Sequence, residues 1–413
     1  MIQSRLAGID QTPFNVVVVG GGMAGAGIAR DLALRGVSVA LFEKGDFASG
    51  TSSKSSKLIH GGLRYLELGD FKLVRESLRE RKTLERVAPH LVRPLPFLVP
   101  VFRGSRRGLV LVRIGMWLYD LLTPGKATER YRTLRAVETL AMEPNIRAED
   151  LKGAGYYFDD LLLFPERMCL ENILSAARHG ARVHNYCQVE EVVKGARGLD
   201  GVRVRDLLTD QVFSVRASVV INAAGPWADR VREMAGVTRT TPRVVRTTKG
   251  IHCLLPRLTE RAVYLSSDSD ERMIFVIPWR DFSLVGTTDT DFAGDPDRIW
   301  ATREEVEYLL SAVRRVLPDP RVTLDHVAYT YAGVRPLSFE AGAPASKVSR
   351  DHKVVLEGPE GRFLTVTGTK LTCFRSLAEE VGDLVMARLG RRQPSTSARL
   401  SLDGLDEDVA KLE

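Results

Sequence analysis

A glycine-rich turn near the N-terminus constrains the fold of this chain more than any other feature. Val16 to Val19 are consecutive valines that lead directly into GGGMAG, residues 20–25. The residues that follow have the apolar spacing of a helix, and a second β-branched run, Val37 to Lys44, comes after them. A strand, a glycine turn, a helix and a second strand in this order predict a parallel βαβ unit.

The glycine spacing has a mechanical reason at each position. Gly20 makes the tight turn, Gly22 lets the backbone approach a pyrophosphate, and Gly25 lets the helix pack against the strand. The pyrophosphate would lie on the helix N-terminus, where N–H groups without helical partners favour anions. Glu43 ends the second predicted strand, where a carboxylate accepts from a ribose hydroxyl and disfavours a ribose 2′-phosphate. We therefore predict a dinucleotide site, with a purely structural glycine turn as the alternative.

Length and charge limit the classes of protein and partner. The 413 residues predict about two or three domains, and a net charge of +7 is compatible with phosphorylated small molecules, anionic membranes and nucleic acid. The sequence contains no zinc-finger, RNP or KH pattern, so we expect no nucleic-acid partner. The scattered cysteines form no C-x-x-C pair, which predicts buried thiols, no metal site and a reducing, cytoplasmic environment.

The apolar segments do not predict a membrane span. The N-terminus lacks the layout of a cleavable signal, because its only apolar run leads straight into the glycine turn. The longest apolar stretch, Gly108 to Leu122, is short for a bilayer and contains Arg113 and Asp120. The basic and apolar segment from Leu91 to Lys126 has two interpretations that stay open, namely docking on the inner face of the cell membrane and burial in a second domain.

The glycine motif alone does not distinguish FAD from NAD, because both present the same ADP half. The next segment, GTSSKSSKLIHGGLRYLELGDF (residues 50–71), supplies more polar lining than an NAD half-site needs. Its core resembles the signature of the FAD-dependent glycerol-3-phosphate dehydrogenases, a branch of the D-amino-acid-oxidase-like flavoproteins. Further matches are APHLVRPLPFLVP (88–100), NAAGPWAD (222–229), FVIPW (275–279), GTTDTD (286–291), GVRPL (333–337) and GTKLTCFR (368–375).

The resemblance implies a function as well as a cofactor. It implies that FAD accepts a hydride from sn-glycerol 3-phosphate, which becomes dihydroxyacetone phosphate, and that electrons pass to quinone or another acceptor such as oxygen. A related enzyme for another hydroxy acid or an amine, and a flavin-binding subunit that needs a partner, are the alternatives. Two features depart from the family: the second glycine before its late lysine is Thr369, and the chain ends at Glu413, where we expect its C-terminal helical domain to be missing. Whether the chain forms a homodimer stays open.

The order of predicted elements gives an α/β fold with two domains. Helices are predicted at residues 71–87, 109–122, 166–179, 303–316 and 371–389, and a hairpin turns at Arg280-Asp281. Thr302 and Glu305 predict a capping box. We expect a discontinuous Rossmann-like FAD-binding domain of residues 1–90, 150–240 and 330–392. A second, mainly antiparallel-sheet substrate domain would comprise residues 91–149 and 241–329, and the charged tail, residues 393–413, would bury little.

The chemistry is assigned to a few residues. His60 is the candidate base, because an imidazole titrates near neutral pH, and the alternative is a hydrogen bond to the cofactor only. Arg335 would bind the phosphate or a substrate oxyanion, unless it is only ion-paired, and Lys370 would add positive charge near the flavin. GTTD is interpreted as a hairpin end. The predicted FAD contacts are Gly20, Gly22, Gly25, Glu43, Thr51, Ser52, Ser55, Ser56, Lys57, His60, Val189, Ala224, Gly225, Gly333, Gly368, Lys370, Leu371 and Thr372.

Overall fold

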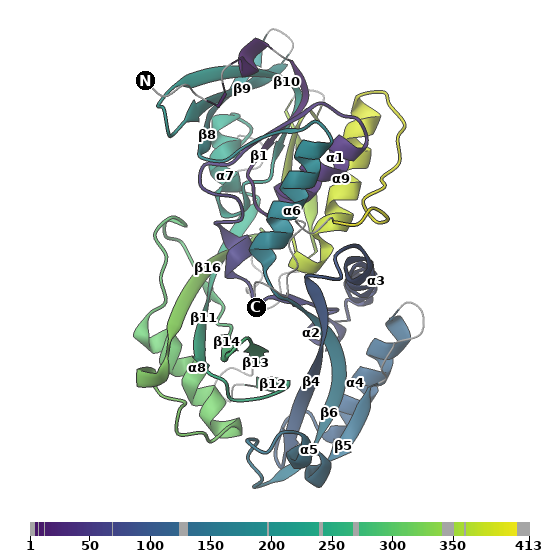
Figure 1. Cartoon of the computed structure of the whole chain (residues 1–413), viewed down its shortest axis with the longest axis vertical. Coiled ribbons are helices and arrows are strands. Elements are labelled where there is room, and N and C mark those ends of the chain that lie inside the picture. The colour runs from purple at the N-terminus through teal and green to yellow at the C-terminus, as the bar shows by residue number, and fades with distance from the viewer. Residues whose placement is uncertain are drawn as a thin grey trace.

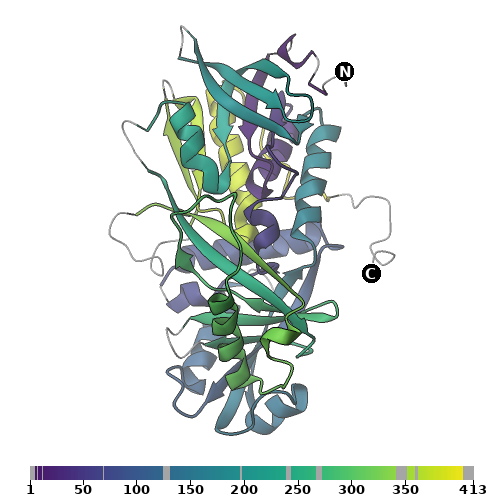
Figure 2. The same cartoon turned by 90° about the vertical axis from the view of Figure 1, so that its left-hand side faces the viewer.

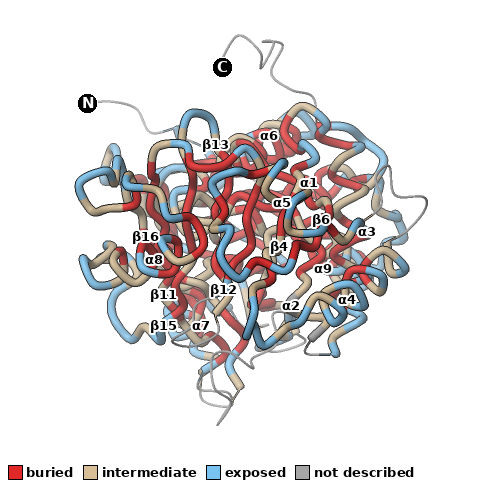
Figure 3. The backbone as a smooth tube through the Cα atoms, turned by 90° about the horizontal axis from the view of Figure 1, so that it is seen from below, coloured by how far each residue is buried: buried red, intermediate tan, exposed pale blue. Residues whose placement is uncertain are grey.

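The chain forms two sheets, each with its own helices, that follow one another along the long axis of the molecule (Figure 1). The computed structural model describes residues 5–6, 8–11, 13–67, 69–123, 131–195, 198–238, 243–266, 272–340, 351–358 and 361–402; the side chains of residues 64 and 67 are not considered. Figure 3 shows that buried segments fill the middle of the molecule and that exposed segments lie mainly at its rim.

The first sheet is built around the predicted βαβ unit. β1 pairs in parallel with β2 and β10, and the sheet order is β17-β18-β10-β1-β2-β7. β8 and β9 form an antiparallel ribbon that extends from β10. The strands are β1 (Phe14–Val19), β2 (Val39–Phe42), β7 (Arg182–His184), β8 (Cys187–Gly195), β9 (Gly198–Asp206), β10 (Val212–Asn222), β17 (Lys353–Glu357) and β18 (Phe363–Thr367).

Helices cover this sheet and bury its apolar side chains. α1 packs between α6 and α9, and its Ile28 and Leu32 join Val16, Val18 and Leu41 in one buried cluster. The helical elements of this half are η1 (Ile9–Gln11), α1 (Met23–Leu34), η2 (Thr51–Lys54), α3 (Phe71–Val87), α6 (Pro165–Arg178), η3 (Gly225–Trp227), α7 (Ala228–Met234), η7 (Leu371–Cys373) and α9 (Phe374–Arg388).

The second sheet is mainly antiparallel, as predicted. Its order is β15-β11-β14-β13-β12-β4-β6-β3, with β16 beside β11 and β5 beside β6, and only the short β12–β4 pair is parallel. The predicted hairpin is confirmed, because Trp279 and Phe282 pair across its turn. The strands are β3 (Leu58–Ile59), β4 (Val92–Phe102), β5 (Arg132–Arg135), β6 (Leu151–Leu162), β11 (Val245–Pro256), β12 (Ala262–Ser266), β13 (Met273–Trp279), β14 (Phe282–Gly286), β15 (Thr290–Asp291) and β16 (Tyr329–Ser338).

The helices of the second half lie against this sheet. α8 begins at the predicted capping box, in which Thr302 Oγ1 accepts from Glu305 N at 3.3 Å and Glu305 Oε2 accepts from Thr302 N at 2.9 Å. Within the part of the chain that the structure describes, no helix is both long and apolar enough to cross a membrane. The remaining helical elements are α2 (Leu63–Glu67), α4 (Leu109–Leu122), α5 (Ala136–Met142), α8 (Arg303–Val316) and η4 (Leu324–His326).

Two predicted domain boundaries disagree with the sheets. β6 (Leu151–Leu162) and β16 (Tyr329–Ser338) were assigned to the FAD-binding domain, but both are strands of the second sheet. β16 pairs with β11 along its whole length, from Tyr329 opposite Leu254 to Ser338 opposite Val245 (Figure 2). The prediction was wrong here because a buried strand pattern does not say which sheet the strand joins.

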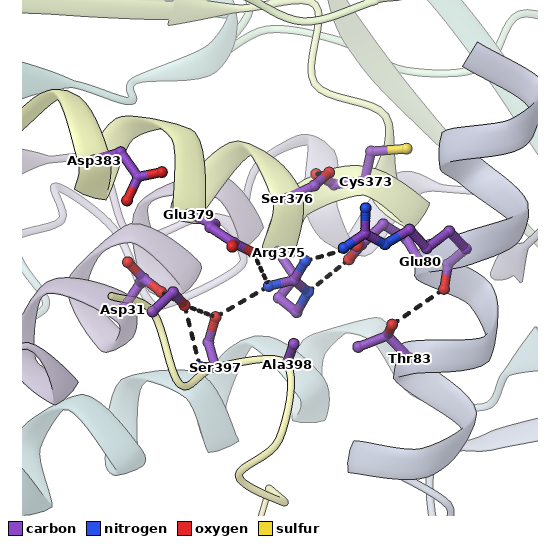
Figure 4. Close-up of polar contacts among 12 residues, drawn as sticks. Asp31, Glu80, Thr83, Cys373, Arg375, Ser376, Glu379, Asp383, Ser397 and Ala398 are labelled. Atoms are coloured by element: carbon purple, nitrogen blue, oxygen red, sulfur yellow. Dashed lines mark hydrogen bonds and ion pairs between the residues drawn. The ribbon is translucent and has the colours of Figure 1, made fainter. Parts of the chain in front are cut away.

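The segment that follows α9 also differs from its prediction as a tail with little to bury. Residues 393–402 pack against α1, α3 and α9, and Leu402, which is buried, donates its backbone N–H to Val87 O at 2.7 Å. Figure 4 shows Ser397 beside the buried guanidinium of Arg375, which donates to Glu80 at 2.7 Å and to Ser397 Oγ at 3.3 Å. A prediction from charge alone missed these contacts. Residues 403–413 lie outside the described part of the chain.

Candidate active site

A cavity of about 840 Å³ lies between the two sheets. Its size is typical of small-molecule and cofactor sites. Its wall comes from the β1–α1 turn, η2, the end of β10, β16 and residues 366–372. Most of the predicted FAD contacts line it: Gly20, Gly22, Glu43, Thr51, Ser52, Ser55, Ser56, His60, Val189, Ala224, Gly225, Gly333, Gly368, Lys370, Leu371 and Thr372.

The glycines of the β1–α1 turn form a cradle that side chains would fill. Gly20 has φ +109°, and a Cβ there would lie 2.6 Å from Ala223 O. A Cβ on Gly25 would overlap Gly20 O, so Gly25 lies behind the cavity and keeps α1 close to the strand, the role predicted for it. Gly22 faces the cavity at the N-terminus of α1, which is suited to bind a pyrophosphate.

Glu43 already holds the backbone around this cradle. Its Oε2 accepts from Gly21 N and its Oε1 from Gly45 N, both at 2.7 Å. Each carboxylate oxygen has two lone pairs, so the side chain retains acceptor capacity toward the cavity that it lines. Glu43 therefore both orders the turn and is available to a ribose hydroxyl.

The far end of the cavity carries charged residues that the sequence reasoning missed. Asp297 comes from the loop after β15, yet it accepts from Lys44 Nζ at 2.6 Å and from Trp227 Nε1 at 3.1 Å. The Lys44 ammonium also lies 4.0 Å from the Trp227 ring centroid. All three residues line the cavity, so a loop of the second half reaches across to the first.

Lys57 is the predicted contact that points elsewhere. It is buried and does not line the cavity; its ammonium lies 3.5 Å from Glu166 and 5.0 Å from the Trp279 ring centroid. Burial lowers the pKa of Lys57, although Glu166 opposes this effect. The neighbouring Ser56 does line the cavity and contacts His252 Nε2 at 2.8 Å. A motif identifies a segment as a site, but it does not say which way each side chain points.

Lys370 is fixed to the backbone of the segment that carries His60. Its Nζ donates to His60 O at 2.8 Å, to Ser77 Oγ at 3.0 Å and to Gly61 O at 3.3 Å. The helix predicted to begin at Leu371 begins there as the 3-10 turn η7 and continues as α9 from Phe374. His60 itself lines the cavity. Its ring lies edge-on to the ring of Phe275, and the two ring centroids are 6.3 Å apart.

Arg335 lines the cavity and is also ion-paired, so it combines both interpretations of this residue. Its guanidinium donates to Thr287 Oγ1 at 2.7 Å, to Thr288 O at 3.0 Å and to Asp289 Oδ1 at 3.1 Å. Arg272 Nη1 lies 3.4 Å from Oδ2, the other carboxylate oxygen of Asp289. The interpretation of GTTD as a hairpin end alone was therefore incomplete, because Thr287 and Asp289 line the cavity and orient Arg335.

His252 is a second imidazole on the cavity wall and was not predicted. It lies on β11, stacks on Tyr331 with centroids 4.8 Å apart, and is almost fully buried. Burial, and then the charges of Arg335 and Lys57, hold the pKa of His252 well below its ordinary value, so the ring is neutral. Its position in an alternating strand pattern was the only sequence signal, and that pattern is equally typical of a core residue.

Comparisons with known proteins agree with this geometry. Residues 15–369 match the family described as FAD dependent oxidoreductase (DAO). The chain is 40% identical to the glycerol-3-phosphate dehydrogenase of Synechocystis over 94% of its own length and 72% of that protein. The chain belongs to the glycerol-3-phosphate dehydrogenase family. It is also 39% identical to the aerobic glycerol-3-phosphate dehydrogenase of Staphylococcus haemolyticus, over 94% of this chain and 70% of that protein.

Solved structures place this member of the glycerol-3-phosphate dehydrogenase family among flavoproteins. The glycerol-3-phosphate dehydrogenase from Bacillus halodurans, complexed with FAD, has a TM-score of 0.79 and 31% identity and covers 98% of this chain and 71% of its own. Glycine oxidase from Geobacillus kaustophilus, at 22% identity and a TM-score of 0.69, shares the fold; the match covers 96% of this chain and 100% of the oxidase. FAD is the cofactor of the family, and the glycine cradle, the N-terminus of α1 and Glu43 fit its ADP half.

Proposed function

We propose that this protein oxidises sn-glycerol 3-phosphate to dihydroxyacetone phosphate. The observation that carries the proposal is the pair of guanidinium groups, Arg335 and Arg272, that meet on Asp289 in the same cavity as the dinucleotide cradle. Guanidinium groups donate in a planar fork that suits a substrate phosphate. The names of the relatives support the same substrate.

Each cavity residue has a proposed task. FAD, when bound, accepts the hydride that leaves C2 of the substrate. Arg335 presents a planar fork that binds and orients the phosphate or the developing oxyanion. His60 takes the proton of the C2 hydroxyl, while Lys370 supplies positive charge at the cavity wall. His252, which is neutral and contacts Ser56, orients the polar lining of η2.

An anaerobic visible spectrum tests the substrate. The purified protein should be yellow, and sn-glycerol 3-phosphate should bleach its flavin absorbance, whereas glycerol, a simple 2-hydroxy acid and an amine should not. Bleaching by the amine or the hydroxy acid alone would assign the protein to another branch of the fold.

We propose a quinone as the electron acceptor. A flavin that the substrate reduces but that neither quinone nor oxygen reoxidises would instead indicate a subunit that needs a partner.

We also propose that α4 docks on an anionic membrane surface. One face of this helix is exposed and apolar, with Val110, Leu111, Ile114, Trp117 and Leu121 each more than half exposed. Figure 1 shows α4 on the outside of the second half, beside β4 and β6. Basic residues accompany this face, since Arg103, Arg106 and Arg113 are exposed. An apolar stripe with arginines fits the boundary between acyl chains and anionic headgroups. This surface would place the enzyme beside a membrane quinone.

A further inference from the structure

A buried polar network lies directly behind the segment that carries His60. Tyr119 Oη donates to Asp159 Oδ1 at 2.6 Å and accepts from Gly61 N at 2.8 Å. The same Asp159 oxygen lies 3.3 Å from Gly61 N and accepts from Arg81 Nη1 at 3.2 Å. Tyr119, Asp159 and Arg81 do not line the cavity, so no task proposed so far uses them.

The network has little freedom to rearrange. Tyr119 is 4% exposed and Asp159 is 1% exposed, so neither has water as an alternative partner. A Cβ on Gly61 would collide with the Tyr119 hydroxyl and with Leu78. The absence of a side chain on Gly61 therefore lets a hydroxyl from α4 reach its backbone.

Lys370 holds the same backbone from the opposite direction. The N–H of Gly61 is bound by Tyr119, whereas the carbonyls of His60 and Gly61 are bound by Lys370 Nζ at 2.8 and 3.3 Å. His60 and Lys370 both line the cavity. Burial raises the pKa of Asp159, and the charges of Arg81 and, more weakly, of Lys370 oppose this effect.

We propose that Tyr119 and Asp159 are positioning residues for the oxidation. They fix the His60–Gly61 backbone so that His60 meets the substrate hydroxyl, and the Asp159 carboxylate offsets part of the positive charge that Lys370 presents to the flavin. The inference rests on the function proposed above and deepens it. Because Tyr119 lies on the buried face of α4, its hydroxyl joins the helix with the exposed apolar stripe to the backbone of Gly61.

The first test is Tyr119→Phe in the holoenzyme, because this change keeps the ring, which packs edge-on to Tyr157. The rate of flavin reduction at saturating substrate should fall about tenfold, the effect of losing one strong hydrogen bond, while KM changes less than about twofold. Hydrogen exchange, followed by mass spectrometry on peptides that contain Gly61, should become faster at this amide. A purely structural role would lower thermal stability without this separation of rate from KM.

The second test is Asp159→Asn, with Asp160→Asn as the matched control. Asp160 is also buried and lies 3.1 Å from Arg81, but no bond joins it to Gly61. Loss of the Asp159 charge should raise the flavin reduction potential, because Lys370 is then less compensated. The comparison is made above about pH 8, where Asp160 is also charged, and there Asp160→Asn should leave the potential near the wild-type value. If the variants fold poorly, the flavin reduction potential and the amide exchange at Gly61, both measured on the folded fraction, still test the positioning role.

The outcomes separate this inference from the proposed function. If glycerol 3-phosphate does not reduce the wild-type flavin, the proposed function is overturned. Amide exchange at Gly61 and the flavin reduction potential would then test the network independently of that function. A wild-type flavin that is reduced, together with a Tyr119→Phe protein whose reduction rate and Gly61 exchange match the wild type, would overturn the positioning role. A potential that Asp159→Asn and Asp160→Asn raise equally would also overturn it.

Discussion

Arg335 combines an observed ion pair with the substrate-binding role that we propose for it. Asp289 and Thr287 hold its guanidinium as a fixed fork, which a lysine cannot reproduce. Arg335→Lys should raise KM for glycerol 3-phosphate about tenfold and lower kcat less, because charge remains but paired donation is lost. Steady-state kinetics measure this, with Arg246→Lys as the control, since Arg246 pairs with Asp291 outside the cavity. Equal losses in both variants would contradict the assignment.

We propose that Lys370 acts on the flavin rather than on the substrate. Lys370→Met removes a positive charge from the cavity wall, so it should lower the flavin potential and slow anaerobic reduction about tenfold or more. Stopped-flow reduction at saturating substrate is the measurement. Lys353→Met, at an exposed lysine paired with Glu340, should leave the reduction rate unchanged. An unchanged rate in Lys370→Met would remove this lysine from the mechanism.

Asp160 predicts a pH dependence of stability. Burial raises the pKa of Asp160 to about 8, outweighing the attraction of Arg81. Between the ordinary carboxyl pKa of about 4 and this value, the folded state keeps a proton that the unfolded state has lost, so stability falls as pH rises and levels off above about 8. Asp160→Asn cannot lose that proton. The Tm of the wild type should therefore fall relative to the Tm of Asp160→Asn between pH 5 and pH 8. A constant difference between the two Tm values would contradict the raised pKa of Asp160.

At the scale of single elements, α4 carries the prediction about membranes. Ile114→Glu with Trp117→Glu places two charges on the exposed apolar face, so co-sedimentation with vesicles that contain phosphatidylglycerol should fall at least about tenfold. The same substitutions should leave FAD content unchanged, because neither residue lines the cavity. Glu substitution at Val137, an exposed residue on α5, is the control. Unchanged vesicle binding, or a change of oligomeric state instead, would show that another partner covers this face.

The elements were predictable where local chemistry decides them. The amphipathic pattern and the Asp70 cap define α3, and the capping box defines the start of α8. Prolines at residues 94, 96 and 100 disfavour a helix, and this segment lies in β4, whose Pro94 and Pro96 are outside its two-residue pairing with β12. Sheet membership of β16 depends on pairing with β11, which is distant in sequence, and so was not predictable. The direction in which a side chain points was also not predictable from the sequence. Lys57, a predicted contact, does not line the cavity, whereas His252, which was not predicted, does.

At the scale of the whole molecule, the two halves meet at the Asp297 contact over the far end of the cavity. The loop after β15 reaches Lys44 and Trp227 of the first half, and the side chains of Lys44 and Asp297 are 36% and 46% exposed. Partly exposed ion pairs contribute little to the stability of a contact, and salt screens them. Solvent and salt can therefore weaken this contact, in contrast to the buried Arg375 cluster that fixes residues 393–402. We propose that it closes the cavity over FAD.

Asp297→Asn should increase the rate of FAD release about twofold to fivefold, the effect expected from one partly exposed charged network. Release can be followed after dilution by the rise of free FAD fluorescence. In the wild type this rate should increase with salt, whereas in Asp297→Asn the salt dependence should be weaker, because the screened interaction is already gone. Lys44→Met should have a smaller effect, because Asp297 also lies 3.7 Å from Arg230. The double variant should release FAD no faster than Asp297→Asn alone, since both changes break the Lys44–Asp297 pair. Asp325→Asn, at an exposed aspartate away from the cavity, is the matched control. Additive effects of the two substitutions, or equal salt dependence in all variants, would mean that the loop does not close the cavity through this contact.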